Sequence, residues 1–176
     1  MSRLDSALER VQHWDKRVCL RCNRALRYRT LPQTCRAISR LGDGIFWYAL
    51  MLALLLLRDD AVRPVLHMVG TGLACTTVYM LLKRGTLRPR PYQVHAIIAR
   101  GASPLDTYSF PSGHTLHAVG FSVVGLAYFP WLAALLVPFT LLTAASRVVL
   151  GLHYPSDVLA GAVLGSLIGA ASLALA

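Results

Sequence analysis

The chain has 176 residues, carries a formal net charge of +10 and is 55% hydrophobic by residue type. One domain fits this length, and a soluble domain of this size would need more polar surface, so the composition indicates several membrane crossings. Basic content this high can point to nucleic acid. Here the basic segments flank apolar runs, so anionic lipid headgroups explain them better and no nucleic-acid partner is expected.

The first forty residues are expected to form a basic amphipathic segment, distinct from a membrane-embedded domain over residues 41–176. Over residues 2–29, apolar side chains recur at helical spacing with arginines between them. Ser2 and Asp5 are expected to cap the start of this helix. Two placements stay open for it: in the headgroup region of the membrane, or packed on the polar face of the protein itself.

The apolar runs that follow predict an all-α, multi-pass bundle of about five transmembrane helices. The expected spans cover residues 41–57, 64–82, 115–129, 131–145 and 155–176. Runs of about fifteen residues are shorter than the roughly 20 that cross a bilayer comfortably, so their ends should extend into the polar flanks.

In the last span, glycines recur every fourth residue at Gly161, Gly165 and Gly169. They form a small, flat face that permits close helix packing. The packing partner is a helix of the same chain or of another copy, and the oligomeric state stays open.

Five spans have a geometric consequence for the polar segments 83–112 and 146–157. The first lies between spans two and three, and the second lies between spans four and five. Both therefore emerge on the same face of the membrane, where their side chains can meet.

The chemistry of these two segments favours a phosphate anion. They hold several fixed cations but few acids, since Asp106 and Asp157 are the only carboxylates between residues 61 and 176. That is too few for a metal site, so neither a metal nor another cofactor is expected. Arginine and lysine neutralise phosphoryl oxygens. Ser112 and Gly113 come just before an apolar helix, whose free N–H groups favour an anion.

The histidines of these segments suit nucleophilic and acid catalysis. One could attack phosphorus while a second protonates the departing oxygen. Asp157 follows His153 by four residues and could accept a hydrogen bond from its ring, which leaves the other nitrogen free to attack. A charged side chain costs on the order of 2.5–3.5 kcal/mol at the bilayer centre and less near its edge, so the cluster with Arg147 favours a functional interpretation.

Simpler interpretations are kept for isolated residues. Arginines at the ends of spans commonly reach to the headgroups as interfacial anchors, which is expected for Arg58, Arg84, Arg88 and Arg100. His117 lies three residues after His114, where it serves as a partner of that histidine or simply as polar packing.

The polar residues fall into three pieces: Lys83-x6-Arg90-Pro91, then Pro111-Ser112-Gly113-His114, then Ser146-Arg147-x5-His153-x3-Asp157. The pattern resembles the three-part signature of the type 2 phosphatidic acid phosphatase superfamily. All three pieces are intact and in order, and they are set among membrane spans.

The resemblance implies a metal-independent lipid phosphatase with an all-helical core. Carried onto this sequence, it makes His153 the nucleophile that forms a phosphohistidine, Asp157 the residue that orients it, and His114 the general acid. It assigns the phosphate to Lys83, Arg90, Ser112, Gly113 and Arg147. Many members have six spans, whereas here the arginine-rich helix stands in place of the first.

The sequence thus predicts a membrane phosphohydrolase of a lipid phosphate or diphosphate. The signature reads only the phosphate, so undecaprenyl diphosphate, phosphatidate, phosphatidylglycerol phosphate and a phosphorylated saccharolipid all stay open. The alternative is a non-enzymatic membrane protein that binds or transports anions, which would need no His–Asp pair beside a second histidine. Lipid is expected to enter laterally past Tyr92, Phe110 and Tyr154, although an interfacial aromatic belt explains these three equally well.

The expected location is the plasma membrane of a bacterium, with the N-terminus and the active site on one side. Ten of the eighteen basic residues lie in the first forty positions, and this favours the cytoplasmic side. The resemblance favours the opposite side, because better-known bacterial relatives that recycle polyprenyl carriers face outward.

Overall fold

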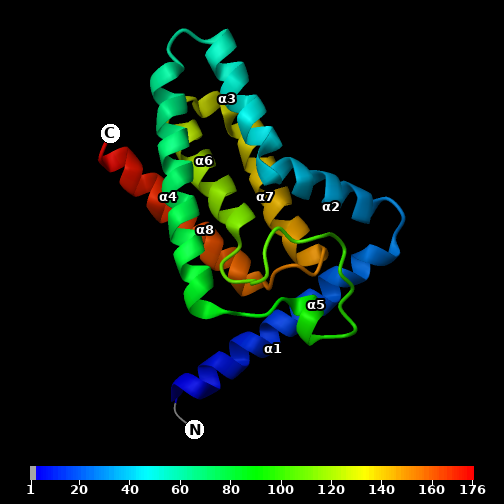
Figure 1. The fold of residues 1–176 in the computed structure, drawn as a ribbon. Helices are drawn as coiled ribbons and strands as arrows, with labels where there is room; N and C mark the ends of the chain where they lie inside the picture. The colour runs from blue at the N-terminus through cyan, green and yellow to red at the C-terminus, as the bar shows by residue number, and fades with distance from the viewer. Residues whose placement is uncertain (1–2) are drawn as a thin grey trace.

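The computed structural model describes residues 3–176, so Ser2 and its expected capping role lie outside the described residues. Within this range the chain is helical, without β-strands (Figure 1), which confirms the all-α prediction. The main helices are α1 (Arg3–Asn23), α2 (Leu31–Arg40), α3 (Phe46–Leu57), α4 (Val62–Thr86), α5 (Pro91–Val94), α6 (Gly113–Tyr128), α7 (Ala133–Val149) and α8 (Pro155–Ala174). Short turns complete them: η1 (Arg24–Arg27), η2 (Leu41–Ile45) and η3 (Pro130–Leu132).

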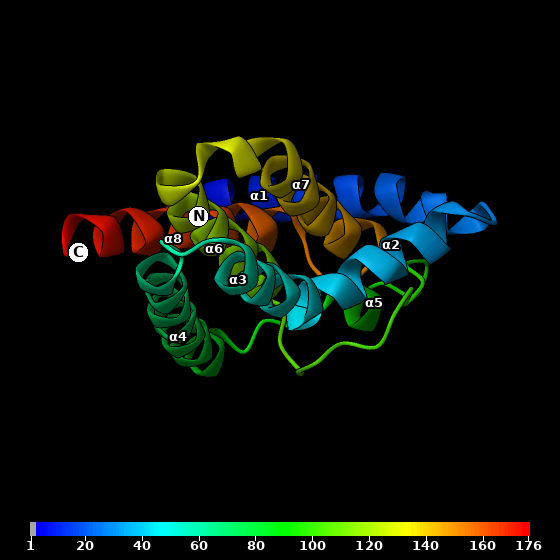
Figure 2. The ribbon, with the colours of Figure 1, turned by 90° about the horizontal axis from the view of Figure 1, so that it is seen from above.

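Four helical segments of the described chain are long and apolar enough to cross a membrane. They are Leu31–Leu57, Val62–Val94, Pro130–Val149 and Pro155–Ala174. The helix α6 is also apolar, but its 16 residues span only about 24 Å, and it packs between α4, α7 and α8 in the middle of the bundle (Figure 2). The five predicted spans therefore correspond to four long helices and one shorter central helix.

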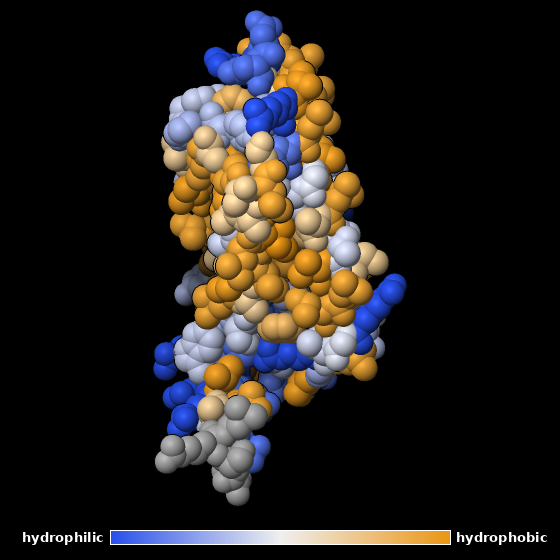
Figure 3. Space-filling view, turned by 90° about the vertical axis from the view of Figure 1, so that its left-hand side faces the viewer, coloured by the Kyte–Doolittle hydropathy of each residue, from blue (hydrophilic) through white to orange (hydrophobic). Residues whose placement is uncertain are grey.

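The outer surface of the bundle is apolar over its middle. Figure 3 shows an apolar band across one face, with hydrophilic side chains at both ends. An exposed apolar surface of this extent is unfavourable in water and matches the hydrocarbon core of a bilayer. The chain is therefore an integral membrane protein. Large apolar side chains exposed on the helices of the bundle include Leu52, Leu56, Leu66, Leu73, Leu141, Leu159, Val163 and Leu167.

The first expected span, residues 41–57, is the second part of a longer helical segment that bends at Gly44. Gly44 has φ +129°, where side chains other than hydrogen are strained, and an added Cβ would lie 2.7 Å from the ring of Tyr48. A single π-helical turn, η2, joins α2 to α3 at this point, and α2 leaves the bundle at an angle (Figure 1). The bend brings Asp43 next to α6.

The glycine stripe of α8 packs against α6 of the same chain. A Cβ added at Gly161 would lie 2.6 Å from the carbonyl oxygen of Ser112, and one at Gly169 would lie 2.9 Å from Cβ of Val123. Gly165 is closer still to the backbone of α6. Of the two packing partners left open by the sequence, the structure uses the one within the chain, and this contact sets the starts of α6 and α8 side by side.

The basic helix α1 packs on the polar end of the bundle. Asp15 and Cys19 are fully buried on its inner face. Asn23 donates to the carbonyl oxygens of Ala99 (2.9 Å) and Val149 (3.1 Å), which ties the end of α1 to a loop and to the end of α7. Of the two predicted placements, the structure shows the one on the protein's own polar face.

Candidate active site

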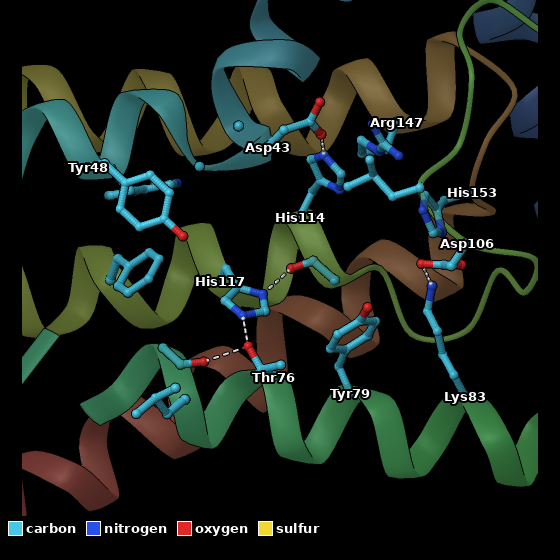
Figure 4. A pocket seen from close by; sticks show the side chains of 18 of the residues that line it. Asp43, Tyr48, Thr76, Tyr79, Lys83, Asp106, His114, His117, Arg147 and His153 are labelled. Atoms are coloured by element: carbon cyan, nitrogen blue, oxygen red, sulfur yellow. Dashed lines mark hydrogen bonds and ion pairs between the residues drawn. The ribbon is translucent and has the colours of Figure 1, made fainter. Parts of the chain in front are cut away.

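The two polar segments meet at one end of the bundle, as the five-span topology predicted. A cavity of about 360 Å³ lies there between α3, α4 and α6 (Figure 4). Ser112 and Asp157 stand behind its wall, joined by a hydrogen bond of 3.0 Å from the Ser112 amide to the Asp157 carbonyl oxygen. The other six predicted site residues line the cavity: Lys83, Arg90, Gly113, His114, Arg147 and His153.

His153 is held in the turn between α7 and α8 by contacts to both ring nitrogens. Its Nδ1 lies 2.7 Å from the carbonyl oxygen of Ser109, which can only accept, so Nδ1 carries the proton. Its Nε2 lies 3.2 Å from Nη1 of Arg90 and accepts from it. This tautomer places the lone pair of the ring on Nε2, the atom that a nucleophile would use, where it accepts the hydrogen bond from Arg90.

The surroundings of His153 keep its ring neutral. Only 1% of the residue is exposed. Burial, and then the charges of Arg147 and Arg90, lower the pKa of His153 well below its ordinary value. An unprotonated imidazole at neutral pH follows, and only that form can attack phosphorus.

Asp157, expected to orient His153 by a hydrogen bond, makes no such bond to the ring in this structure. Its Oδ2 lies 3.8 Å from Nδ1 of His153, which is too long for a hydrogen bond. Asp157 instead accepts from the backbone N–H of Tyr154 (2.8 Å) and from Nη1 of Arg88 (2.5 Å). It thereby fixes the turn that carries His153, while the Ser109 carbonyl takes the contact expected for Asp157.

His114 begins α6 and contacts a carboxylate from another element. Its Nε2 pairs with Oδ1 of Asp43 on the bent turn η2 (Figure 4). Asp43 is not among the site residues that the sequence predicts. The carboxylate balances positive charge on the ring when the ring is protonated, and it leaves Nδ1 as the nitrogen available for proton transfer to a ligand.

Three cations face the cavity, and two of them have unused donors. Arg90 and Arg147 are 1% and 2% exposed, and the Nε atom of each is buried without a hydrogen-bond acceptor. Arg147 also contacts Oγ of Ser39 on α2. Buried guanidinium donors without acceptors are unfavourable in an empty protein interior, so their arrangement indicates a site for an anion. The third cation, Lys83, pairs with Asp106.

The prediction that Arg88 is an interfacial anchor is wrong. Its Nη2 lies 2.7 Å from Asp15 of α1, its Nη1 lies 2.5 Å from Asp157, and its guanidinium stacks 4.2 Å above the ring of Tyr154. Asp15 also accepts from the backbone N–H of Ser156 at 2.9 Å. The anchor interpretation fails because α1 packs against the turn that carries His153 and places the buried Asp15 next to Arg88.

The far part of the cavity is apolar and lies between α3 and α4. The described residues that line the cavity do not include the three aromatic residues expected at its entrance, Tyr92, Phe110 and Tyr154. His117 is in the wall, but its ring contacts Thr76 and the carbonyl oxygen of Gly113, which favours polar packing over a role with His114. The apolar part is lined by Trp47, Tyr48, Met51, Val69, Leu73 and Phe121.

Comparison with known proteins agrees with the motif pattern. Residues 61–176 match the PAP2 superfamily. The undecaprenyl-diphosphatase BcrC of Bacillus subtilis is 35% identical over 128 residues, which are 72% of this chain and 66% of that protein. The decaprenylphosphoryl-5-phosphoribose phosphatase of Mycobacterium tuberculosis is 32% identical over 139 residues, or 78% of this chain and 76% of that protein.

The fold agrees as well. The structure of a transmembrane PAP2-type phosphatidylglycerolphosphate phosphatase of Bacillus subtilis superimposes with a TM-score of 0.76 at 23% identity, covering 94% of this chain and 85% of that one. The family match spans all three signature pieces, from Lys83 to Asp157. The chain therefore belongs to the PAP2 superfamily, and the predicted class, a membrane phosphohydrolase of lipid phosphates, is confirmed.

Proposed function

We propose that this protein hydrolyses a polyprenyl phosphate or diphosphate through a phosphohistidine on His153. One observation carries the proposal: a buried, neutral imidazole with an unprotonated Nε2 lines the same cavity as the cations Lys83, Arg90 and Arg147. A protein that only binds or transports anions needs the cations but has no use for an oriented nucleophile beside a second histidine.

In the first step, Nε2 of His153 attacks phosphorus and the P–O bond to the lipid breaks. The lipid oxygen keeps the electron pair of that bond and takes a proton from His114, whose partner Asp43 steadies the ring. The three cations offset the charge that builds on the phosphoryl oxygens. The N–H of Gly113 at the start of α6 adds a further donor.

In the second step, a water molecule attacks the phosphohistidine and passes its proton to His114. The P–N bond breaks, inorganic phosphate leaves, and Nε2 regains its lone pair. Ser112 does not line the cavity. Its amide donates to the carbonyl oxygen of Asp157 and its hydroxyl hydrogen-bonds with that of Thr115 at 3.0 Å, so it holds the start of α6 in place rather than the phosphate.

The polyprenyl class is favoured by two observations. Both curated relatives reported above carry the name of a prenyl lipid, undecaprenyl in one and decaprenylphosphoryl-5-phosphoribose in the other. The apolar part of the cavity continues from the cations into the band of the bundle that faces lipid, so a single extended hydrocarbon chain can lie there with its phosphate at His153.

We further infer that the site faces the cytoplasm of a bacterial cell. At the end opposite the site (Figure 1), the loop between α3 and α4 and the first turn of α4 carry Arg58 and Arg63 against Asp59 and Asp60. The other sixteen basic residues lie on the side of α1 and the catalytic loops, and such an excess marks the cytoplasmic side. A cysteine introduced at Arg100 should resist an impermeant thiol reagent in intact cells. Strong labelling there would place the site outside.

Phosphate release by purified protein in detergent, with a chelator present, tests the proposed reaction. Polyprenyl monophosphate and diphosphate should be hydrolysed faster than phosphatidate, and His153→Ala should abolish release. The matched control is His13→Ala, which removes an exposed histidine of α1 and should leave the rate unchanged. Full activity in His153→Ala would defeat the mechanism, and anion binding without hydrolysis would favour the non-enzymatic alternative.

A further inference from the structure

The phosphate pocket contains a carboxylate of the protein's own chain. Oδ2 of Asp106 lies 2.5 Å from Nζ of Lys83, and Oδ1 lies 2.7 Å from Nη2 of Arg90. The side chain lines the cavity and is 31% exposed, and Figure 4 shows its ion pair with Lys83. The carboxylate of Asp106 thus bridges Lys83 and Arg90, two of the cations that are assigned to the substrate phosphate.

A count of donors shows that Asp106 competes for positions a phosphate would need. Nη1 of Arg90 donates to the carbonyl oxygen of Leu152 and to His153, and Nη2 donates to the backbone and side-chain oxygens of Asp106. The four hydrogens on these two nitrogens are therefore in use. A phosphate can receive charge-assisted bonds from Nη2 only if Asp106 gives them up.

Lys83 leads to the same result. Its ammonium group donates to the carbonyl oxygen of Tyr108 at 3.0 Å and pairs with Asp106, which leaves one of three hydrogens. Burial alone would raise the pKa of Asp106, but the hydrogen bonds and charges of Lys83 and Arg90 outweigh it and hold the pKa below its ordinary value. Asp106 is therefore ionised at neutral pH and holds its place as an anion.

Asp106 lies on a loop that can release it without unfolding the bundle. The loop is fixed on one side by a hydrogen bond from the Gly101 amide to the Leu150 carbonyl oxygen (2.9 Å). On the other side the Ser109 amide donates to the Arg88 carbonyl oxygen (2.8 Å). Between these points the chain forms no regular helix, so the carboxylate can swing away while Ser109 keeps its contact with His153.

We propose that Asp106 is an internal ligand of the phosphate pocket, which the phosphate of the substrate displaces and which returns as inorganic phosphate leaves. The inference rests on the proposed function, and it adds a determinant of specificity. A lipid phosphate offsets the cost of displacing Asp106 by placing its hydrocarbon chain in the apolar part of the cavity. Free phosphate has no such compensation, so the device keeps product and cytoplasmic phosphate out of the site.

The test is the affinity of the pocket for inorganic phosphate and for orthovanadate, measured as thermal stabilisation of purified protein in detergent. The variant Asp106→Asn keeps the shape of the side chain and removes its charge. It should bind both anions about tenfold more tightly, the effect expected of one hydrogen bond to a charged group. Asp106→Glu keeps the charge and should bind them no more tightly than the wild type. Asp59→Asn, a change of an exposed acid at the opposite end, is the matched control.

The same substitution separates a competitor from a scaffold. A residue that merely holds Lys83 and Arg90 in position would, when changed to Asn, weaken anion binding and raise KM for the lipid. Here Asp106→Asn should lower KM and increase inhibition by product phosphate. Unchanged or weaker anion binding in Asp106→Asn overturns the inference, and so does a wild type that hydrolyses lipid phosphate while neither protein binds free phosphate.

The outcome is independent of whether the proposed reaction is correct. In a His153→Ala background the protein cannot form a phosphohistidine, yet Asp106→Asn should still tighten phosphate binding. If Asp106→Asn tightens phosphate binding but the wild type hydrolyses no lipid phosphate, the internal ligand is supported and the reaction is rejected. Hydrolysis without tightening would do the reverse.

Discussion

The two histidines of the site have different partners, and the difference fits the different roles proposed for them. His153 is buried, donates a hydrogen bond from Nδ1 to the carbonyl oxygen of Ser109, and accepts one at Nε2 from Arg90. His114 stands at the start of α6 and pairs with the carboxylate of Asp43. A neutral carbonyl and surrounding cations keep a ring unprotonated, which suits a nucleophile. A carboxylate tolerates a proton moving on and off the ring, which suits an acid.

The largest test of this comparison is His114→Gln. With a lipid phosphate, the loss of the general acid should slow turnover by roughly 10²- to 10⁴-fold. With p-nitrophenyl phosphate, the leaving group needs no proton, so the first turnover should release nitrophenol at nearly the wild-type rate and a slow phase should follow. Rapid-quench measurement of both substrates decides the matter. Equal losses on both would show that His114 is not the acid.

Asp43→Asn sharpens the comparison, since it changes only the partner of His114. We expect a decrease in kcat on the order of tenfold, the contribution of a hydrogen bond to a charged group. The effect should again be smaller with p-nitrophenyl phosphate, and Asp59→Asn should have none. A wild-type kcat in Asp43→Asn would mean that the carboxylate plays no part in proton transfer.

The smallest effect concerns the pH dependence that the surroundings of His153 produce. Burial and nearby cations lower the pKa of His153 below its ordinary value of 6.5. The acidic limb of kcat/KM, where the ring becomes protonated, should therefore lie below pH 6.5. Because the charge of Lys83 contributes to this shift, Lys83→Gln should move the limb to higher pH. The matched control, Lys16→Gln at an exposed lysine, should not move the acidic limb. If the limb does not move in Lys83→Gln either, it does not report the protonation of His153.

The motif residues could be found from the sequence because topology alone brings them together. An even number of spans separates the segment of Lys83 and Arg90 from that of Arg147 and His153, so both had to emerge at one end. Helical spacing likewise identified the glycine stripe of α8. These inferences depend on periodicity and on counting spans, which a single sequence provides.

The partners of those residues were missed for physical reasons. Ser109 acts through its backbone carbonyl, which leaves no trace in the side-chain pattern. Asp43 contacts His114 only because the helix bends at Gly44. Asp15 contacts Arg88 only because α1 packs against the turn that carries His153. One signal was available: in a chain of net charge +10, four of the eight acidic residues lie at the site. They are Asp15, Asp43, Asp106 and Asp157, and each pairs with a cation or histidine of this region.

The most direct test of the account is to trap the covalent intermediate. Rapid quench in alkali of protein turning over a ³²P-labelled lipid phosphate should give a label that survives base, is lost in acid, and maps to the peptide containing His153. With ³²P-labelled p-nitrophenyl phosphate, His114→Gln should accumulate this label, because formation of the intermediate then needs no proton while its release by water is slowed. A label on another residue, or labelling that persists in His153→Ala, would contradict the central role of His153.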